Sequence, residues 1–199
     1  TLLIVFAVMF GIFLVLVQYL QAVAGFSALR SAAGLLPMAA VMMPLSATAP
    51  TIAKRFGAFR VLLIGVAIFA VGLATLAIFS SSTGGYLSVL PGLIIMGAGM
   101  GLSMTPSTAA ITESLPHEKQ GVASALNDTV REVGGAIGVA LLGSVLNSSY
   151  RGNVAGATEG LPPELAGPVE DGIGGALAVA GQLGEDGASL AAAARDAFV

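Results

Sequence analysis

The sequence predicts an all-α membrane protein, a polytopic bundle of five helices that each cross a lipid bilayer. Hydrophobic residues make up 56% of the chain and charged residues 10%, with a mean hydropathy of +0.93, whereas a soluble domain carries about 25% charged residues. The charges are also clustered, since residues 1–29, 31–53 and 61–112 contain none. Each uncharged run reaches the roughly 20 residues that a spanning helix needs, and is too continuous for the alternating strands of a membrane barrel.

The individual spans follow from these apolar runs and from the short turns between them. The first run has no basic region and no small-residue cleavage site, so it is interpreted as a spanning helix and not as a signal peptide. Because the chain begins with Thr1 and not with methionine, we expect it to be a fragment. The turns GFSALR, AKRFGAFR, SSSTGG and SLPHEK separate five predicted spans at about 2–24, 31–52, 61–80, 86–112 and 120–147.

Basic residues in the turns predict how the spans are oriented. The second and fourth turns contain Lys54, Arg55, Arg60 and Lys119, while the first and third contain only Arg30. Lysine and arginine accumulate in cytoplasmic loops, so the first helix is expected to run from the inside to the outside. The three tyrosines, which favour the membrane interface, then fall near the outer ends of their helices, at positions 19, 86 and 150.

Residues 148–199 differ in composition from the spans. They carry two basic and seven acidic groups, a net charge of −5, and are rich in glycine, proline and alanine. We expect an extracytoplasmic acidic loop that leads towards a missing last helix. Within it, 172–183 is apolar but too short and too glycine-interrupted to span, and the alanine-rich segment 186–199 is expected to be helical.

Two glutamines and two methionines are candidates for a substrate cavity. Gln18 and Gln21 are three residues apart, so an α-helix would place both on one face. A buried unpaired amide costs roughly 1–3 kcal/mol, so these side chains are expected to face a polar cavity or another helix. Met96 and Met100 share a face of the fourth span, and methionine suits promiscuous apolar binding surfaces. Ordinary packing is the alternative for both methionines.

The start of the fifth span carries charges that are candidates for an inner gate. The apolar part, Val133–Leu146, is about 21 Å long as a helix, short of a hydrocarbon core of roughly 30 Å. Further residues must therefore enter the membrane at its inner edge, and they include Asn127, Asp128, Arg131 and Glu132. Arg131 is spaced to pair with Asp128 or Asn127 within one helix. We expect a paired gate or packing cluster there, with direct proton coupling as the alternative.

Small residues and prolines predict packing and bending of the spans. Gly97 and Gly101 form a GxxxG pair in the fourth span, and Gly134 and Gly138 are spaced alike in the fifth. Such spacing allows two helices to approach closely, so these glycines are expected to serve helix packing. The second span is expected to be kinked, either as a hinge or as static curvature, by prolines at positions 37, 44 and 50.

Two runs of the sequence resemble major facilitator superfamily transporters, and in particular the 14-helix drug:proton antiporters of bacteria. They are GAGMGLSMTPSTAAITESLPHEKQGVASALNDTVREVGGAIGVALLGSVL, similar to the late helices, and YLQAVAGFSALRSAAGLLPMA, similar to the start of the C-terminal half. The turn PTIAKRFGAFR partly resembles the superfamily's cytoplasmic signature. Arg55 and Gly57 match it, whereas Pro50, Lys54 and Ala58 depart from it, so no charge-relay role is assigned to this turn.

The resemblance implies the first five helices of a six-helix C-terminal half. Its partners would be the missing N-terminal half of the same chain, a small amphipathic substrate, protons and the lipid bilayer of a bacterial cell membrane. The implied mechanism is alternating access, in which two bundles rock about a cavity near the midplane and substrate leaves as protons enter. In the family the principal proton-binding acid usually lies in the N-terminal half, so none is assigned in this chain.

A proton-coupled exporter of amphipathic drug-like compounds is therefore the leading hypothesis. A metabolite uptake carrier or facilitator of the same superfamily, or a non-transporting membrane scaffold or sensor, are the alternatives. An enzyme is not expected, because no nucleophile–base pair is visible. Neither a cofactor nor a metal is expected, because the chain has no cysteine and its single histidine, His117, lacks an obvious set of partners. Binding to nucleic acid is not expected either.

Overall fold

The computed structural model describes residues 2–113, 116, 119–159, 161–184 and 187–199, and the regular structure in these ranges is helical. The helices are, in order, α1 (Leu2–Gln18), the π-helix η1 (Tyr19–Val23), α2 (Ala28–Gly34), α3 (Leu36–Phe56), α4 (Ala58–Phe79), α5 (Gly85–Glu113), α6 (Gln120–Thr158), α7 (Pro163–Asp171), α8 (Ile173–Leu183) and α9 (Gly187–Phe198). Within these described ranges, five segments are long and apolar enough to cross a membrane, namely Leu3–Val23, Ala28–Phe56, Ala58–Phe79, Gly85–Thr108 and Gln120–Thr158. The predicted helical membrane bundle is confirmed.

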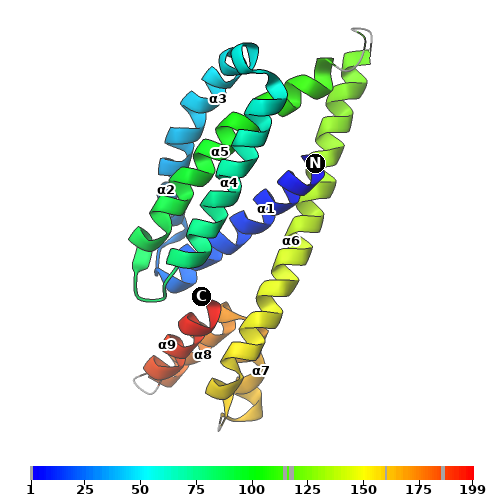
Figure 1. The fold of residues 1–199 in the computed structure, drawn as a ribbon. Coiled ribbons are helices and arrows are strands. Elements are labelled where there is room, and N and C mark those ends of the chain that lie inside the picture. The colour runs from blue at the N-terminus through cyan, green and yellow to red at the C-terminus, as the bar shows by residue number, and fades with distance from the viewer. Residues whose placement is uncertain (1, 114–115, 117–118, 160, 185–186) are drawn as a thin grey trace.

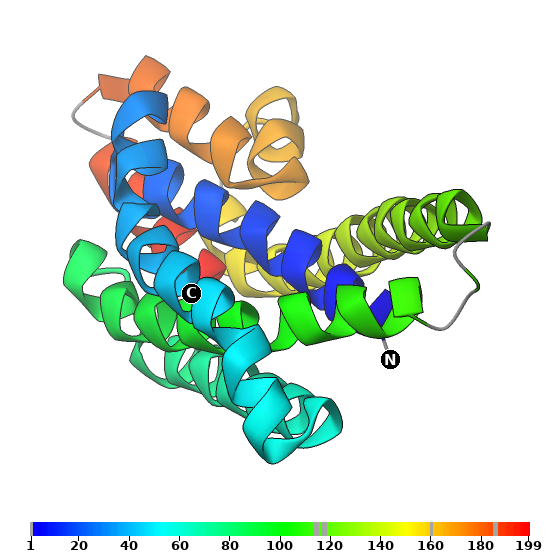
Figure 2. The same cartoon turned by 90° about the horizontal axis from the view of Figure 1, so that it is seen from above.

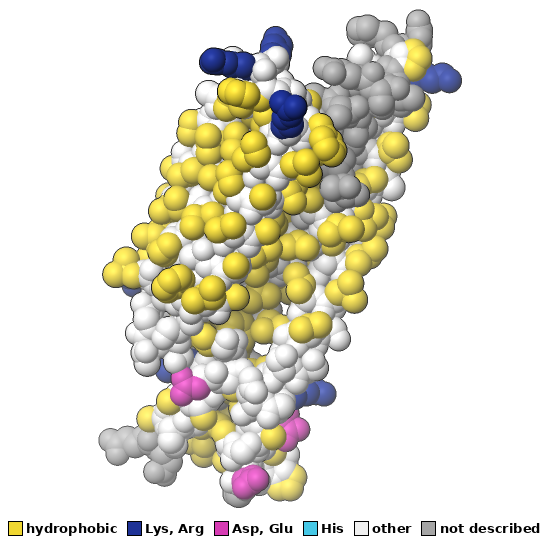
Figure 3. Space-filling model, in the orientation of Figure 1, with side chains coloured by type: hydrophobic (Ala, Val, Ile, Leu, Met, Phe, Trp, Pro, Cys, Tyr) yellow, Lys and Arg dark blue, Asp and Glu magenta, His cyan; other side chains and the backbone are white. Residues whose placement is uncertain are grey.

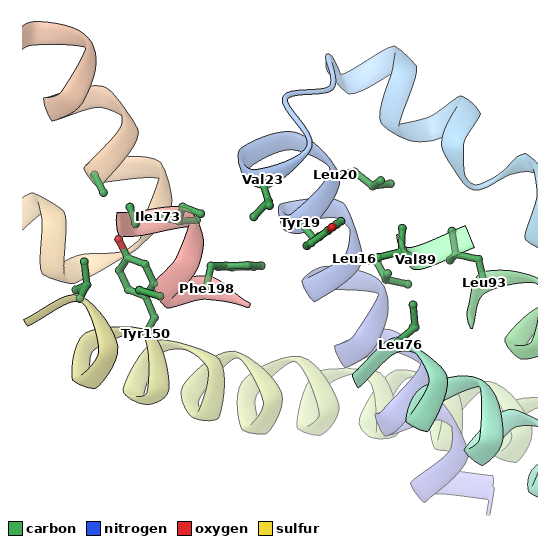
Figure 4. Close-up of a cluster of buried hydrophobic side chains, with 14 of the residues drawn as sticks. Leu16, Tyr19, Leu20, Val23, Leu76, Val89, Leu93, Tyr150, Ile173 and Phe198 are labelled. Atoms are coloured by element: carbon green, nitrogen blue, oxygen red, sulfur yellow. The ribbon is translucent and has the colours of Figure 1, made fainter. Parts of the chain in front are cut away.

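The spans form two groups that α1 connects. Helix α5 packs against both α3 and α4, while α6 packs mainly along α1, which crosses the first group obliquely (Figures 1 and 2). Buried leucines join the groups into one apolar cluster, to which α1 contributes Leu16, η1 contributes Leu20, α4 contributes Leu76 and α5 contributes Leu93 (Figure 4). Most of the surface of α6 consequently faces no other described part of the chain.

The end of the fifth span and the segment after it differ from the expectation. Helix α6 continues past residue 147 to Thr158, and the expected loop contains α7, α8 and α9. Glycine and proline separate these helices without preventing them: Pro163 lies in the first turn of α7, where its missing N–H costs nothing, and Gly172 divides α7 from α8. Gly184 ends α8 with φ at 63°, a conformation that favours glycine. We call α7–α9 the cap (Figure 1).

The cap is held to both α6 and η1. On α6, Arg151 forms an ion pair of 2.6 Å with Asp171, and the Asn153 side-chain amide donates to the Ala197 carbonyl at 3.2 Å. From α9, Arg195 Nε donates to the Ala22 carbonyl at the end of η1, also at 3.2 Å. A cation suits the negative end of a helix, so the cap binds the ends of two spans that themselves run side by side.

A hydrogen bond between helices compensates a proline in α3. Pro50 has no N–H, so the Ser46 carbonyl four residues earlier loses its usual helical donor. Thr105 Oγ1 of α5 donates to that carbonyl at 3.3 Å and also bonds to Ser46 Oγ at 2.7 Å. Thr105 directly precedes Pro106, a second proline inside a helix. The two proline-containing helices are therefore tied together at this point.

Replacing Thr105 by valine is expected to destabilise the α3–α5 contact. The shape is nearly unchanged, but the Ser46 carbonyl is left without a donor, which costs about 1–3 kcal/mol. The measurement is the thermal unfolding of the purified whole transporter. The control is Thr75→Val, because the half-buried Thr75 donates from Oγ1 at 2.8 Å to the Val71 carbonyl of its own helix and so joins no two helices. Equal shifts in the two variants would contradict the assigned role of Thr105.

Candidate functional site

The charged start of α6 lies on the surface of the described chain. Asp128, Arg131 and Glu132 are exposed and Asn127 is half-buried. Among the residues that the structure describes, no ion pair joins Arg131 to Asp128, so the expected pairing within the helix is not present. The Arg131 guanidinium instead lies 5.4 Å from the centre of the Phe6 ring of α1, within the range of a cation–π contact.

The two sides of α6 differ in polarity. At 3.6 residues per turn, Asp128, Arg131 and Glu132 fall on one side and the exposed Val133 and Ile137 on the roughly opposite side. The apolar side suits lipid. The charged side does not, because charges in a span face a bundle interior or a water-filled cavity. The charged side therefore needs a cover that the described chain does not supply.

An aromatic stripe on α1 lies next to this charged side. Phe10 and Phe13 are 38% and 42% exposed. Val17 of α1 and Gln21 of η1 extend the stripe beyond Phe13. Phe13, Val17 and Gln21 line an open hollow of about 420 Å³, whose other wall comes from α2 and α3. The Phe10 ring lies against α6, where a Cβ added to Gly135 would be 3.1 Å from it. Aromatic and charged side chains thus form one continuous surface across α1 and α6.

The two candidate glutamines do not face the same hollow. Gln21 lines the hollow beside α3, whereas Gln18 lines another between α6 and the cap, together with Asn147 and Tyr150. The prediction of a shared face assumed an α-helix. The chain changes to the π-helix η1 at Tyr19, and its wider turn rotates Gln21 away from Gln18.

The two candidate methionines are buried in the core. Met96 and Met100 are 1% and 8% exposed and belong to the main apolar cluster. Met96 lies so close to α4 that a Cβ on Gly72 would be 2.6 Å from its Cγ. Since α5 packs against α3 on one side and α4 on the other, its methionine face is covered. The structure therefore favours packing over a cavity role for both side chains.

The four candidate glycines lie where two helices meet. A Cβ at Gly101 would be 2.6 Å from the Met42 carbonyl of α3, and one at Gly97 would overlap the Met38 carbonyl. A Cβ at Gly134 would be 2.7 Å from the Leu3 carbonyl of α1. Gly138 is tighter still, because its Cβ would overlap the Ala7 backbone. Further close approaches occur between α4 and α5, at glycines 65 and 72 of α4 and 99 of α5, and between α1 and α6 at glycine 11.

The signature-like turn is the connection between α3 and α4. Gly57 alone separates the two helices, with φ at 91°, a conformation that favours glycine. The Arg55 guanidinium lies 5.4 Å from the Phe56 ring centre. Figure 3 shows basic side chains at this end of the molecule, and both acidic and basic side chains towards the cap. This distribution accords with a cytoplasmic turn, while the sidedness itself stays a prediction.

Among the described residues, no three histidine, cysteine, aspartate or glutamate side chains gather in a metal-binding group. His117 lies outside the residues that the structure describes.

The fold and this surface define a multi-pass helical membrane protein with an uncovered, partly charged side. The chain belongs to the Major Facilitator Superfamily, whose family model matches residues 1–139. It is 35% identical over 166 residues to the multidrug efflux pump LfrA of Mycolicibacterium smegmatis, covering 83% of this chain and 32% of that protein. It is 31% identical over 189 residues to the tetracenomycin C resistance and export protein of Streptomyces glaucescens, covering 91% and 35%.

A third relative is the multidrug resistance protein Stp of Mycobacterium tuberculosis, 35% identical over 142 residues, which are 71% of this chain and 26% of that protein. The chain spans about a third of the length of the curated relatives it matches. The superfamily consists of transporters, and with five spans and bacterial relatives this chain is a multi-pass protein of the bacterial cell membrane.

Proposed function

We propose that this chain is part of a secondary active transporter that exports amphipathic drug-like compounds in exchange for protons. The transport cycle is alternating access, in which this bundle and an N-terminal bundle rock about a cavity between them. The chain supplies one wall of that cavity from α1 and α6. The inner end of the wall is formed by Asp128, Arg131 and Glu132, and its wider part by the aromatic stripe of α1.

One observation carries the proposal, the uncovered surface across α1 and α6. Phe10 contacts α6 beside Gly135, and Phe6 lies under the Arg131 guanidinium. Exposed charges at membrane depth require another bundle or water against them, and exposed aromatic rings supply apolar contact area for a substrate. A second bundle facing this surface satisfies both requirements.

The chemistry of the surface favours amphipathic compounds over sugars or small anions. Phe10, Phe13 and Val17 offer area without hydrogen bonds, and Gln21 is a neutral polar group at the end of the stripe. Export of drugs is further supported by the relatives, whose names describe efflux of several drugs, resistance to them, or export of tetracenomycin C.

The test is ethidium transport by the whole transporter in membrane vesicles with an imposed pH gradient. Phe13→Ala is expected to raise the half-saturating ethidium concentration about tenfold, because a lost aromatic contact is worth about 1.4 kcal/mol. The control is Phe79→Ala, since Phe79 is 60% exposed on α4, away from α1 and α6. If the transport rate of the unaltered protein did not depend on the imposed pH gradient, proton exchange would be refuted. Equal effects of the two substitutions would refute the aromatic wall.

A further inference from the structure

A second hollow lies between the spans and the cap. It encloses about 190 Å³ and is lined by side chains of α1, α6, the α7–α8 junction and α9. Its polar lining comes from Gln18, Asn147, Tyr150 and Asp171, and its apolar lining includes Leu146 and Phe198. The hollow at the aromatic stripe shares none of these residues. The lining side chains come from two spans and the cap, so the hollow exists only because the cap is folded against the spans.

Tyr150 provides the observation that points to a ligand. Its side chain is 2% exposed, and its hydroxyl has no hydrogen-bond partner among the described residues. Figure 4 shows it reaching from α6 towards Ile173 of the cap. The other two tyrosines are bonded: Tyr19 donates to the Ser81 carbonyl and Tyr86 to the Gly34 carbonyl, both at 2.7 Å. A buried hydroxyl without a partner is costly, so a polar group in the hollow would stabilise it.

The charges around the hollow indicate what kind of ligand fits. Asp171 is the acidic residue of its lining, and its carboxylate is already paired with Arg151 at 2.6 Å. The remaining polar groups are the neutral amides of Gln18 and Asn147 and the Tyr150 hydroxyl. Beside them, the Phe198 side chain offers apolar contact. The hollow thus suits a ligand that carries a hydrogen-bonding group beside an apolar body. The net charge of the ligand is not what the lining recognises.

We propose that this hollow is an outer subsite of the transporter, where Tyr150, Gln18 and Asn147 bind the hydrogen-bonding group of an amphipathic substrate. The proposal rests on the proposed function for the identity of its ligand. It places the subsite at the cap end of α1 and α6, away from the charged cluster at the start of α6. The substrate class is amphipathic compounds that carry amino, hydroxyl or carbonyl groups.

The test compares two cations that differ in hydrogen bonding. Ethidium carries aromatic amines, whereas tetraphenylphosphonium has neither donors nor acceptors. Equilibrium binding of each is measured on the purified whole transporter, and transport is measured in vesicles. Tyr150→Phe is expected to weaken ethidium binding about three- to tenfold, the factor of one neutral hydrogen bond, and to leave tetraphenylphosphonium within about twofold. Gln18→Leu is expected to act in the same direction, again on ethidium alone.

Tyr86→Phe is the matched control, because it removes a hydroxyl that is bonded within the protein. It is expected to leave the ratio of the two affinities unchanged. Equal weakening of both cations by Tyr150→Phe, or no weakening of either, would overturn the subsite. A wild-type protein that binds ethidium through Tyr150 without gradient-driven transport would refute the proposed function and retain the subsite.

Discussion

Replacing Gly138 with alanine is expected to remove most of the folded transporter from the membrane. Helices α1 and α6 approach most closely there, and the added methyl group would overlap the Ala7 backbone carbonyl and Cα. A backbone cannot rotate away as a side chain does, so the cost is expected to be about 3 kcal/mol or more, at or above the usual range for overpacking. Since a loss of about 1–2 kcal/mol can already change protein abundance several-fold, we expect at least about tenfold less folded protein, measured as monodisperse material after extraction from membranes.

Gly143→Ala is the control for this prediction. It lies five residues further along α6, and its added methyl group would be 3.8 Å from Leu14 Cδ2, an ordinary contact. Alanine is the better helix former by about 1 kcal/mol, so this variant is expected to be as stable as the wild type or slightly more stable. Wild-type amounts of monodisperse protein for Gly138→Ala would show that α1 and α6 do not meet as described.

The features that were predictable from sequence are those that depend on local spacing. Apolar runs of sufficient length predict spanning helices because hydrocarbon thickness sets one requirement for all of them. The spacing of Gly134 and Gly138 predicts a face suited to close approach. It could not predict that the partner is Leu3 and Ala7 of α1, because that pairing is set by packing between residues far apart in the chain.

The features that were not predictable depend on a change in local geometry or on the surrounding helices. Gln18 and Gln21 were assigned one face, and a π-turn starting at Tyr19 separates them. The four-residue spacing of Met96 and Met100 correctly places them on one face of the helix. Only the position of α5 between α3 and α4 shows that other helices cover this face. The Tyr150 hydroxyl, which has no hydrogen-bond partner in the described part of the chain, is buried by the cap, and most of the cap was expected to be loop.

Arg131→Ala is expected to lower the transport rate of the whole protein at least about tenfold, equivalent to 1.4 kcal/mol, while the amount of folded protein stays the same. Arg131 lies between Asp128 and Glu132 in the sequence and all three are exposed, so its removal leaves the two acids of the proposed inner cluster without their neighbouring cation. Folding is expected to be spared because the closest contacts between α6 and α1 are at glycines, whereas the Arg131 side chain is exposed and adds only its contact with the Phe6 ring. Arg131→Lys is expected to restore part of the rate, since it keeps the charge but not the planar contact with Phe6.

The matched control is Arg30→Ala, because Arg30 also lies over a phenylalanine, with its guanidinium 4.2 Å from the Phe26 ring centre. Arg30 lies in α2 and has no acidic neighbours in the sequence, so it is not part of the charged cluster at the start of α6. If loss of an arginine–phenylalanine contact were enough, both variants would lose transport equally. A selective loss in Arg131→Ala assigns the effect to charge at the inner end, whereas wild-type transport in Arg131→Ala would rule out the inner-gate role.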